Sequence, residues 1–406
     1  MRLLGPLPVL AILCLLAGPA SGEREPPAAL PGEFVIGISA GQVVEPGDYA
    51  LAAQAGFGYA LAPRPDADCS LALLKGCEAA GMKAVVWDAR IATYGLGDGN
   101  AYSAALAEYR KSSALGGYVI FSSLYVPVTR TGSLYWKQRD IGWSDQKHFR
   151  YCEAVPLSAF PDEKAYPAYL RSYLASVIGY VVYEETAPSS ATALRAMKLT
   201  ADVCGELGKP WWRRCRLADA TPAMVRWQAF SAAAHGCRGI FYLTARALGD
   251  QRDTLLDDAG KPTAACAAAT AANARLRAIG PILMNTKLTG VFASGSIPGL
   301  PAGDQQAAPR REGLLRPRIP GLPPVTASSP APGDAFLIGR LEKGESVYAF
   351  VVRKPSDDDE PADRTSPSAV TVRAAGGGAL AIAETGAACD GPVALRPGEG
   401  QLFEIK

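Results

Sequence analysis

The clearest pattern along the chain is a series of short apolar runs, each followed by a turn and then by a longer segment rich in alanine and leucine. In residues 178–185, an apolar run with β-branched side chains ends in the two carboxylates Glu184 and Glu185. Such a run is typical of a strand that is buried on both faces. Because carboxylates are rarely buried without partners, the pair is predicted to mark the point where the strand leaves the core. The alternative is that both glutamates are solvated loop residues.

Eight units of this kind follow one another along the first two thirds of the chain. The strands are predicted at residues 34–38, 57–61, 82–88, 117–121, 149–155, 178–185, 210–215 and 237–243. Regular alternation of strands and helices favours parallel strands with helical crossovers. Eight units over roughly 250 residues match a (β/α)8 TIM barrel of the α/β class in length and order. An open doubly wound sheet is the alternative, but no Gly-x-Gly-x-x-Gly fingerprint follows any strand.

The pattern changes after Pro281. Residues 297–333 are rich in proline and are predicted to form a linker or a long irregular loop. From Phe336 onward, apolar and polar residues alternate, which is typical of short antiparallel strands. The predicted division is a signal peptide at 1–22, a barrel at 23–283, a first β-strand and proline-rich linker at 284–333, and a C-terminal antiparallel β-sandwich at 334–406.

The amino terminus has the features of a cleaved export signal. Arg2 supplies positive charge, residues 7–16 are apolar, and Ala20-Ser21-Gly22 is a small-residue cleavage site. The mature chain is therefore predicted to start at Glu23 and to be secreted or periplasmic. The apolar stretch is too short for a membrane span, and no later stretch is long enough. A lipid anchor on Cys14 is the alternative to free export.

Composition argues against several classes of function. Lys and Arg number 41 and Asp and Glu number 39, so no strong field favours nucleic acid or an anionic membrane, and no nucleic-acid motif is present. With two histidines and no Cys-x-x-Cys spacing, neither a zinc site nor another cofactor is expected. The cysteines beyond the signal are predicted to be mainly buried thiols, with an occasional disulfide. The oligomeric state stays open.

Four stretches carry a resemblance to a known group of proteins. Residues 55–59, 116–120 and 224–243 resemble parts of the barrel, and residues 395–403 resemble the closing strand of the appended β-domain, in the clan of glycoside hydrolases that includes the family 42 β-galactosidases. The resemblance implies a barrel that acts on oligosaccharides. It also implies an acid/base glutamate at the end of the fourth strand and a nucleophilic glutamate at the end of the seventh.

This chain departs from that clan at both positions. The fourth strand ends in Phe121-Ser122-Ser123-Leu124 and the seventh in Arg213-Arg214-Cys215, without a carboxylate. Retaining glycosidases need two carboxyl groups roughly 5 Å apart, and inverting enzymes need them further apart. The acids that remain at predicted strand ends are the candidate catalytic residues: Asp88, Glu153, Glu184 and Glu185. Of the last two, Glu184 is predicted to face the barrel interior.

Six further residues are candidates for substrate binding: Trp87, Tyr183, Trp211, Trp212, Arg213 and Tyr242. The aromatic ones would stack on sugar rings; the alternative is that they pack in the barrel core. Arg213 and Arg214 would either bind an acidic sugar or pair with Glu184 and Glu185, and pairing is favoured because buried charges need partners.

Two functions fit the sequence. The first is an exported glycoside hydrolase-like barrel protein that binds oligosaccharides and, with relocated acids, hydrolyses them. The second is a non-catalytic carbohydrate-binding or scaffold protein on a degenerate glycosidase barrel. The missing glutamates favour the second function, and the remaining acids keep the first open.

Overall fold

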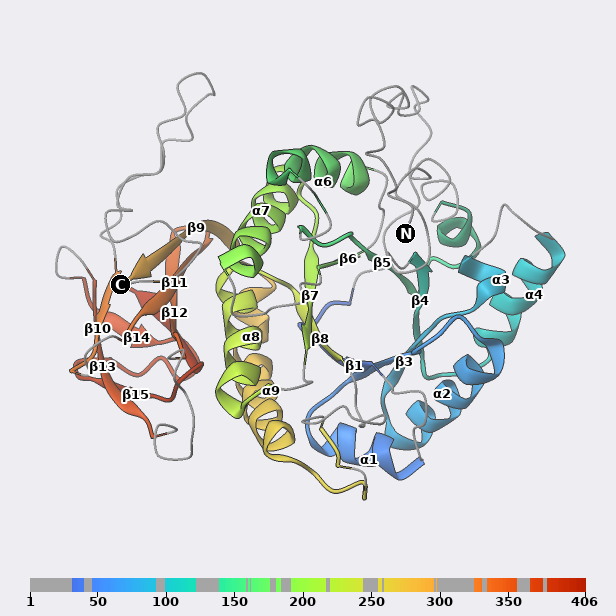
Figure 1. The fold of residues 1–406 in the computed structure, drawn as a ribbon, viewed down its shortest axis with the longest axis horizontal. Coiled ribbons are helices and arrows are strands. Elements are labelled where there is room, and N and C mark those ends of the chain that lie inside the picture. The colour runs from blue at the N-terminus through green and yellow to red at the C-terminus, as the bar shows by residue number, and fades with distance from the viewer. Residues whose placement is uncertain are drawn as a thin grey trace, which may run out of the picture.

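Eight parallel strands close into a barrel in the order β1 to β8 (Figure 1). The structure is a computed structural model, and it describes residues 31–39, 46–92, 99–121, 139–157, 160, 162–175, 180–183, 191–216, 220–243, 255–257, 259–295, 297, 325–330, 334–355, 366–374 and 378–406. The strands are β1 (Val35–Ser39), β2 (Tyr59–Leu61), β3 (Lys83–Val86), β4 (Leu115–Phe121), β5 (Phe149–Glu153), β6 (Tyr180–Tyr183), β7 (Trp211–Arg216) and β8 (Gly239–Leu243). Because β8 pairs with β1, the predicted α/β barrel is confirmed and the open sheet is excluded.

Helices connect successive strands and cover the outside of the barrel (Figure 1). They are α1 (Pro46–Gln54), α2 (Ala67–Ala80), α3 (Ala89–Ala92), α4 (Gly99–Tyr109), α6 (Tyr166–Ala175), α7 (Ala191–Leu207), α8 (Pro222–Ala234) and α9 (Ala264–Leu283), with a 3-10 turn, η4 (Glu163–Ala165), before α6. Helix α8 begins as the sequence predicts: the side chain of Thr221 accepts a hydrogen bond from the Met224 amide, and proline occupies the first turn.

Aromatic side chains fill the barrel interior. The ring of Trp212 lies 5.1 Å from that of Phe149 and 5.4 Å from that of Phe241, measured between centroids. Glycine on the neighbouring strand makes room for them: a Cβ on Gly37 would lie 2.2 Å from the Phe241 ring. The interior is therefore a packed core rather than a pore, as is usual for this architecture.

Two antiparallel sheets follow the barrel. One has the order β14-β16-β12-β11-β9 and the other the order β10-β13-β15. Their strands are β9 (Lys287–Ser294), β10 (Val325–Ser328), β11 (Phe336–Lys343), β12 (Ser346–Arg353), β13 (Ser368–Ala374), β14 (Leu380–Ile382), β15 (Val393–Leu395) and β16 (Gly400–Ile405). Both sheets contribute to one buried apolar cluster that includes Ile338, Val351 and Val372.

The stretch predicted as linker contains a strand. Strand β10 lies within residues 297–333 and pairs antiparallel with β13, so the sheet reaches back into that stretch. Helix α9 also continues two residues beyond Pro281, where the pattern change was placed. The predicted signal peptide at 1–22, most of the proline-rich stretch and residues 357–360 lie outside the described residues.

Helix α8 joins the two parts of the molecule. It is buried almost throughout, with the barrel strands on one side and the five-stranded sheet on the other (Figure 1). The rings of Phe230 and Phe350 lie 6.1 Å apart across this interface, and Arg226 Nε donates to the Pro397 carbonyl at 3.1 Å. The contact is so close that a Cβ on Gly339 would lie 1.9 Å from the carbonyl oxygen of Ala234.

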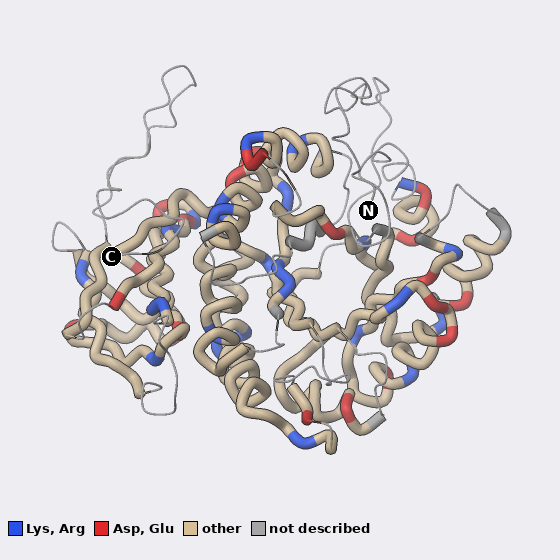
Figure 2. The backbone as a smooth tube through the Cα atoms, in the orientation of Figure 1, with Lys and Arg blue, Asp and Glu red and all other residues tan. Residues whose placement is uncertain are grey.

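The cysteines present in the described part of the chain are all free, and six of the eight are buried. Burial raises the pKa of the Cys77 thiol to about 12, so it stays protonated and unreactive near neutral pH. Among the described residues, no helix is long and apolar enough to cross a membrane, and no group of three His, Cys, Asp or Glu side chains is placed to hold a metal ion. Charged residues of both signs are spread along the described backbone of both parts (Figure 2).

Replacing Gly339 with alanine tests the contact between α8 and the sheet. The added methyl group would overlap the Ala234 carbonyl, and backbone cannot yield as a flexible side chain would. We expect Gly339→Ala to lower the free energy of unfolding by about 1–3 kcal/mol, as overpacking of a core does. Gly205→Ala in α7, where nothing lies within 4 Å of the new Cβ, should instead be neutral or stabilising. Equal unfolding midpoints for the two variants in denaturant titrations would contradict this contact.

His235 is fully buried at the point where α8 ends. Burial lowers the pKa of this imidazole to about 4, and Nδ1 is bonded to the Ser231 carbonyl at 2.7 Å. As pH falls from about 6.5 to about 4, the unfolded chain takes up a proton that the folded protein excludes, so stability is lost over that window. The loss should be roughly 3 kcal/mol at about 1.4 kcal/mol for each pKa unit. His235→Gln should flatten that part of the stability–pH curve; an unchanged slope would contradict the assignment.

Candidate functional site

The carboxyl ends of the barrel strands bring several candidate residues to one mouth. Asp88 follows β3 by two residues, Glu153 is the last residue of β5, and Arg214 lies near the end of β7. Parallel strands of a closed barrel all end on the same side, which is where active sites of this architecture are built. These three residues therefore surround the opening at which a ligand would bind.

An ion pair between Glu153 and Arg214 is the central feature of this mouth. Arg214 Nη1 lies 2.6 Å from Glu153 Oε1, and the two side chains are only 10% and 5% exposed. The Tyr151 hydroxyl donates to the same Oε1 at 3.2 Å. The register pairs Glu153 with Val182 and Val182 with Trp212, which puts the glutamate on the same face as Trp212, toward the barrel interior. Glu153 is thus a fixed hydrogen-bond acceptor whose charge Arg214 balances.

Asp88 is held by a second group of donors. Arg90 donates to Oδ2 from Nε at 2.9 Å and from Nη2 at 2.6 Å, and its amide donates to Oδ1 at 2.7 Å. The Tyr109 hydroxyl donates to Oδ2 at 2.5 Å. Burial opposes ionisation of Asp88, but the hydrogen bonds from Arg90 and Tyr109 outweigh it and keep the pKa of this carboxyl below its ordinary value. Asp88 is therefore ionised at neutral pH and fastens α3 and α4 to the end of β3, which leaves it unsuited to donating a proton.

Strand alternation separates the two arginines of β7. Arg214 faces the interior, whereas Arg213 points outward, where its Nη1 donates to the Gln228 carbonyl at 3.0 Å and to Ser231 Oγ at 2.9 Å on α8. Arg213 is 2% exposed, so the structure gives no support to its prediction as a substrate-binding residue. Arg214 pairs with Glu153, and the predicted pairing of the arginines with Glu184 and Glu185 falls outside the described residues.

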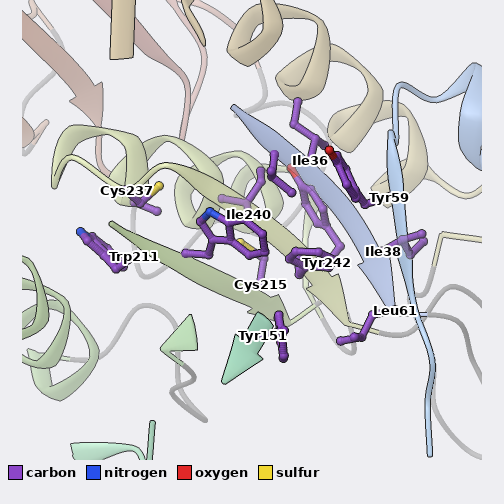
Figure 3. Packing of buried hydrophobic residues seen from close by; sticks show 14 of the residues in the cluster. Ile36, Ile38, Tyr59, Leu61, Tyr151, Trp211, Cys215, Cys237, Ile240 and Tyr242 are labelled. Atoms are coloured by element: carbon purple, nitrogen blue, oxygen red, sulfur yellow. The ribbon is translucent and has the colours of Figure 1, made fainter. Parts of the chain in front are cut away.

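Most of the predicted aromatic residues are part of the core. Trp212 is fully buried inside the barrel. Trp211 and Tyr242 lie among the buried side chains around β7, β8 and β1, and the Tyr242 ring packs edge-on against that of Phe57 at 5.4 Å (Figure 3). Trp87 is 8% exposed, and its backbone is tied to Ser70 by two hydrogen bonds. These placements match the alternative in which the aromatic residues pack the barrel.

Glu184 and Glu185 directly follow strand β6 in the sequence. Glu184 and Glu185 lie outside the described residues, and so does the side chain of Tyr183. The backbone of Tyr183 ends β6 and is in register with Arg213. Strand β6 therefore ends directly before the two glutamates, and their catalytic role stays a prediction.

Tyrosines of α6 hold the end of β5, a role that was not predicted from the sequence. Tyr173 donates a hydrogen bond to the backbone carbonyl of Glu153 at 2.7 Å, and the Tyr169 hydroxyl accepts one from the Val155 amide at 3.0 Å. Their spacing was a usable signal: tyrosines at 166, 169 and 173 recur at three and four residues, which places them on one face of a helix.

Comparisons with known proteins support the fold. No family model matches the chain, and no curated protein matches it. A β-galactosidase from Bacillus circulans sp. alkalophilus matches with a TM-score of 0.53 at 8% identity, over 92% of this chain and 99% of that chain. Weaker matches include a thermostable xylanase mutant from Cellvibrio japonicus, with a TM-score of 0.43 at 10% identity over 59% of this chain and 97% of the other. A β-galactosidase from the psychrophilic Marinomonas ef1 reaches 0.45 at 9% identity over 60% of each chain.

Identities this low establish the fold alone. The first match extends over both the barrel and the sheets that follow it. The chain therefore has a glycoside hydrolase-like barrel fold, and the activity printed for each neighbour belongs to that neighbour.

The ion pair at the mouth can be tested by a double-mutant cycle. Arg214→Met removes one charged partner of the buried Glu153 carboxylate. We expect a loss of about 3–5 kcal/mol in the free energy of unfolding. Adding Glu153→Gln removes the negative charge of that carboxylate. The double variant should therefore recover a large part of the lost free energy of unfolding. Additive effects in denaturant titrations of the two single variants and the double variant would show that the residues are not coupled.

Proposed function

We propose that this protein is an exported, glycoside hydrolase-like barrel protein that binds oligosaccharides at the mouth of the barrel without hydrolysing them. The observation that carries the proposal is the Glu153–Arg214 ion pair. In the resembled clan, the end of the seventh strand holds the nucleophilic glutamate. Here that strand contributes Arg214, which pairs with the acid of β5. Likeness to the family 42 β-galactosidases, with a C-terminal β-sandwich, is part of this proposal.

The chemistry of the described residues favours binding over catalysis. A glycosidase needs one protonated carboxyl group to protonate the leaving oxygen and a second carboxylate on the other side of the bond. Asp88 is kept ionised by Arg90 and Tyr109, and Glu153 is engaged by Arg214 and Tyr151. A guanidinium donates and a carboxylate accepts hydrogen bonds, so the Glu153–Arg214 pair complements the hydroxyl groups of a sugar.

Hydrolysis is the second candidate, and one observation favours it. Strand β6 ends at Tyr183, at the same end of the barrel as Glu153, and Glu184 and Glu185 are the next two residues in the sequence. With Glu153 they would supply the two carboxyl groups that glycoside hydrolysis requires. Export from the cytoplasm, inferred from residues 1–22, is common to both candidates.

A glycan array read for both retention and product formation distinguishes the two candidates. We expect the wild-type protein to retain one class of oligosaccharide and to release it unchanged. If turnover is found instead, the protein is an enzyme, and Glu184→Gln or Glu185→Gln should lower the rate at least about a hundredfold. Glu206→Gln is the matched control, because Glu206 of α7 forms an exposed ion pair with Arg171 of α6, and this change should alter neither readout. Absence of retention and of turnover on every glycan would refute a carbohydrate function.

A further inference from the structure

Four aromatic rings contact one another in a cluster beside the carboxyl end of β5. They are Phe160, Tyr166, Tyr169 and Tyr173. The centroids of Tyr169 and Tyr173 are 5.6 Å apart in a stacked arrangement, and Phe160 lies 5.0 Å from Tyr169 and 5.3 Å from Tyr166. Such spacings lie within the range at which aromatic rings attract one another.

This cluster of rings is attached to β5, the strand that carries Glu153. Tyr173 donates to the Glu153 carbonyl, and Tyr169 accepts from the Val155 amide. These bonds attach α6 to the loop that leaves the barrel at its mouth, and Figure 1 shows α6 on the outer side of the barrel, next to α7. Phe160 stands in the same loop between β5 and α6, and its own amide donates to the Leu157 carbonyl at 2.9 Å. Contacts through the rings of Tyr169 and Tyr173 therefore connect Phe160 to the backbone of Glu153.

The exposed fraction of the side chain differs among the four rings in a way that points to a ligand. Tyr166 and Tyr173 are buried, whereas Phe160 and Tyr169 are half-buried. The hydroxyl of Tyr169 is occupied by Val155, but a phenyl ring has no polar group that would account for contact with water. Phe160 is also supported by two neighbouring rings, so it is presented as a rigid apolar surface. Binding sites for small molecules are lined largely by aromatic side chains, with a few polar groups that fix orientation.

We propose that Phe160 is a platform on which one pyranose ring of an oligosaccharide stacks, next to the ring that contacts the Glu153–Arg214 pair. A pyranose has an apolar C–H face, which matches the phenyl ring, and a hydroxyl edge, which matches the ion pair. Two ring contacts, Tyr169 and Tyr173, separate Phe160 from the backbone of Glu153. This inference rests on the proposed carbohydrate-binding function.

Calorimetric titration of a retained glycan and its component monosaccharide tests the platform. Phe160→Leu keeps an apolar side chain but removes the flat face, and it should weaken binding of the oligosaccharide about tenfold, a change of about 1.4 kcal/mol. Binding of the monosaccharide should not change. Phe160→Trp, with a wider face, should bind the oligosaccharide at least as tightly as the wild type. The matched control is Trp143→Leu, because Trp143 is 50% exposed but precedes the amino-terminal end of β5, at the opposite end of the strand.

Each outcome decides a different point. If the wild type binds the oligosaccharide and Phe160→Leu behaves like Trp143→Leu, the platform is refuted and the proposed function stands. An equal loss for monosaccharide and oligosaccharide also overturns it, because the effect would then arise at the ion pair. If Phe160→Leu does not fold, weaker binding by Phe160→Trp overturns the platform. A wild-type protein that binds no glycan overturns both the platform and the proposed function.

Discussion

The burial of α8 on both sides is the constraint on which the rest of the structure depends. An ordinary barrel helix has one apolar stripe toward the strands and a polar face toward water. Here the second face is covered by the five-stranded sheet, so nearly every residue from Ala223 to Ala234 is buried. The sheet approaches so closely because glycine faces the helix: Gly398 packs against the Ala223 carbonyl and Gly339 against that of Ala234. The barrel and the five-stranded sheet thereby share one continuous core.

Several polar side chains buried in this core form hydrogen bonds, although His235 Nε2 has no partner among the described residues. Arg213 enters from β7 and donates to the Gln228 carbonyl and to Ser231, and the Ser231 carbonyl in turn accepts from His235. Arg275 of α9 forms ion pairs with Glu384 and Glu399. An unpaired polar group would cost several kcal/mol in such surroundings. The interface is therefore specific in geometry as well as apolar.

Much of the fold could be predicted, because apolar runs separated by glycine and proline mark the strands, and the barrel strands pair in the order in which they occur in the chain. The site could be predicted only in part. In Trp211-Trp212-Arg213-Arg214, both alternating sets contain one large aromatic residue and one cation, so sequence alone does not say which set faces inward. The partner of Arg214 stands 61 residues earlier on β5, a tertiary contact that no local pattern encodes. Strand β10 was missed for a similar reason, since its pairing with β13 forms across a long proline-rich stretch.

The ion pair and the aromatic core beneath it together restrict how a ligand can bind. A buried ion pair is weak evidence for stability, because well-packed apolar residues in its place are often as stable or more so. The proposed ligand-binding role would account for an ion pair at this position that folding does not require. Below it, Trp212, Phe149 and Phe241 close the interior, so no ligand can penetrate the barrel. A molecule recognised here must lie across the rim, and an extended chain that spans several groups is better suited to that surface than a compact ligand that needs a deep pocket.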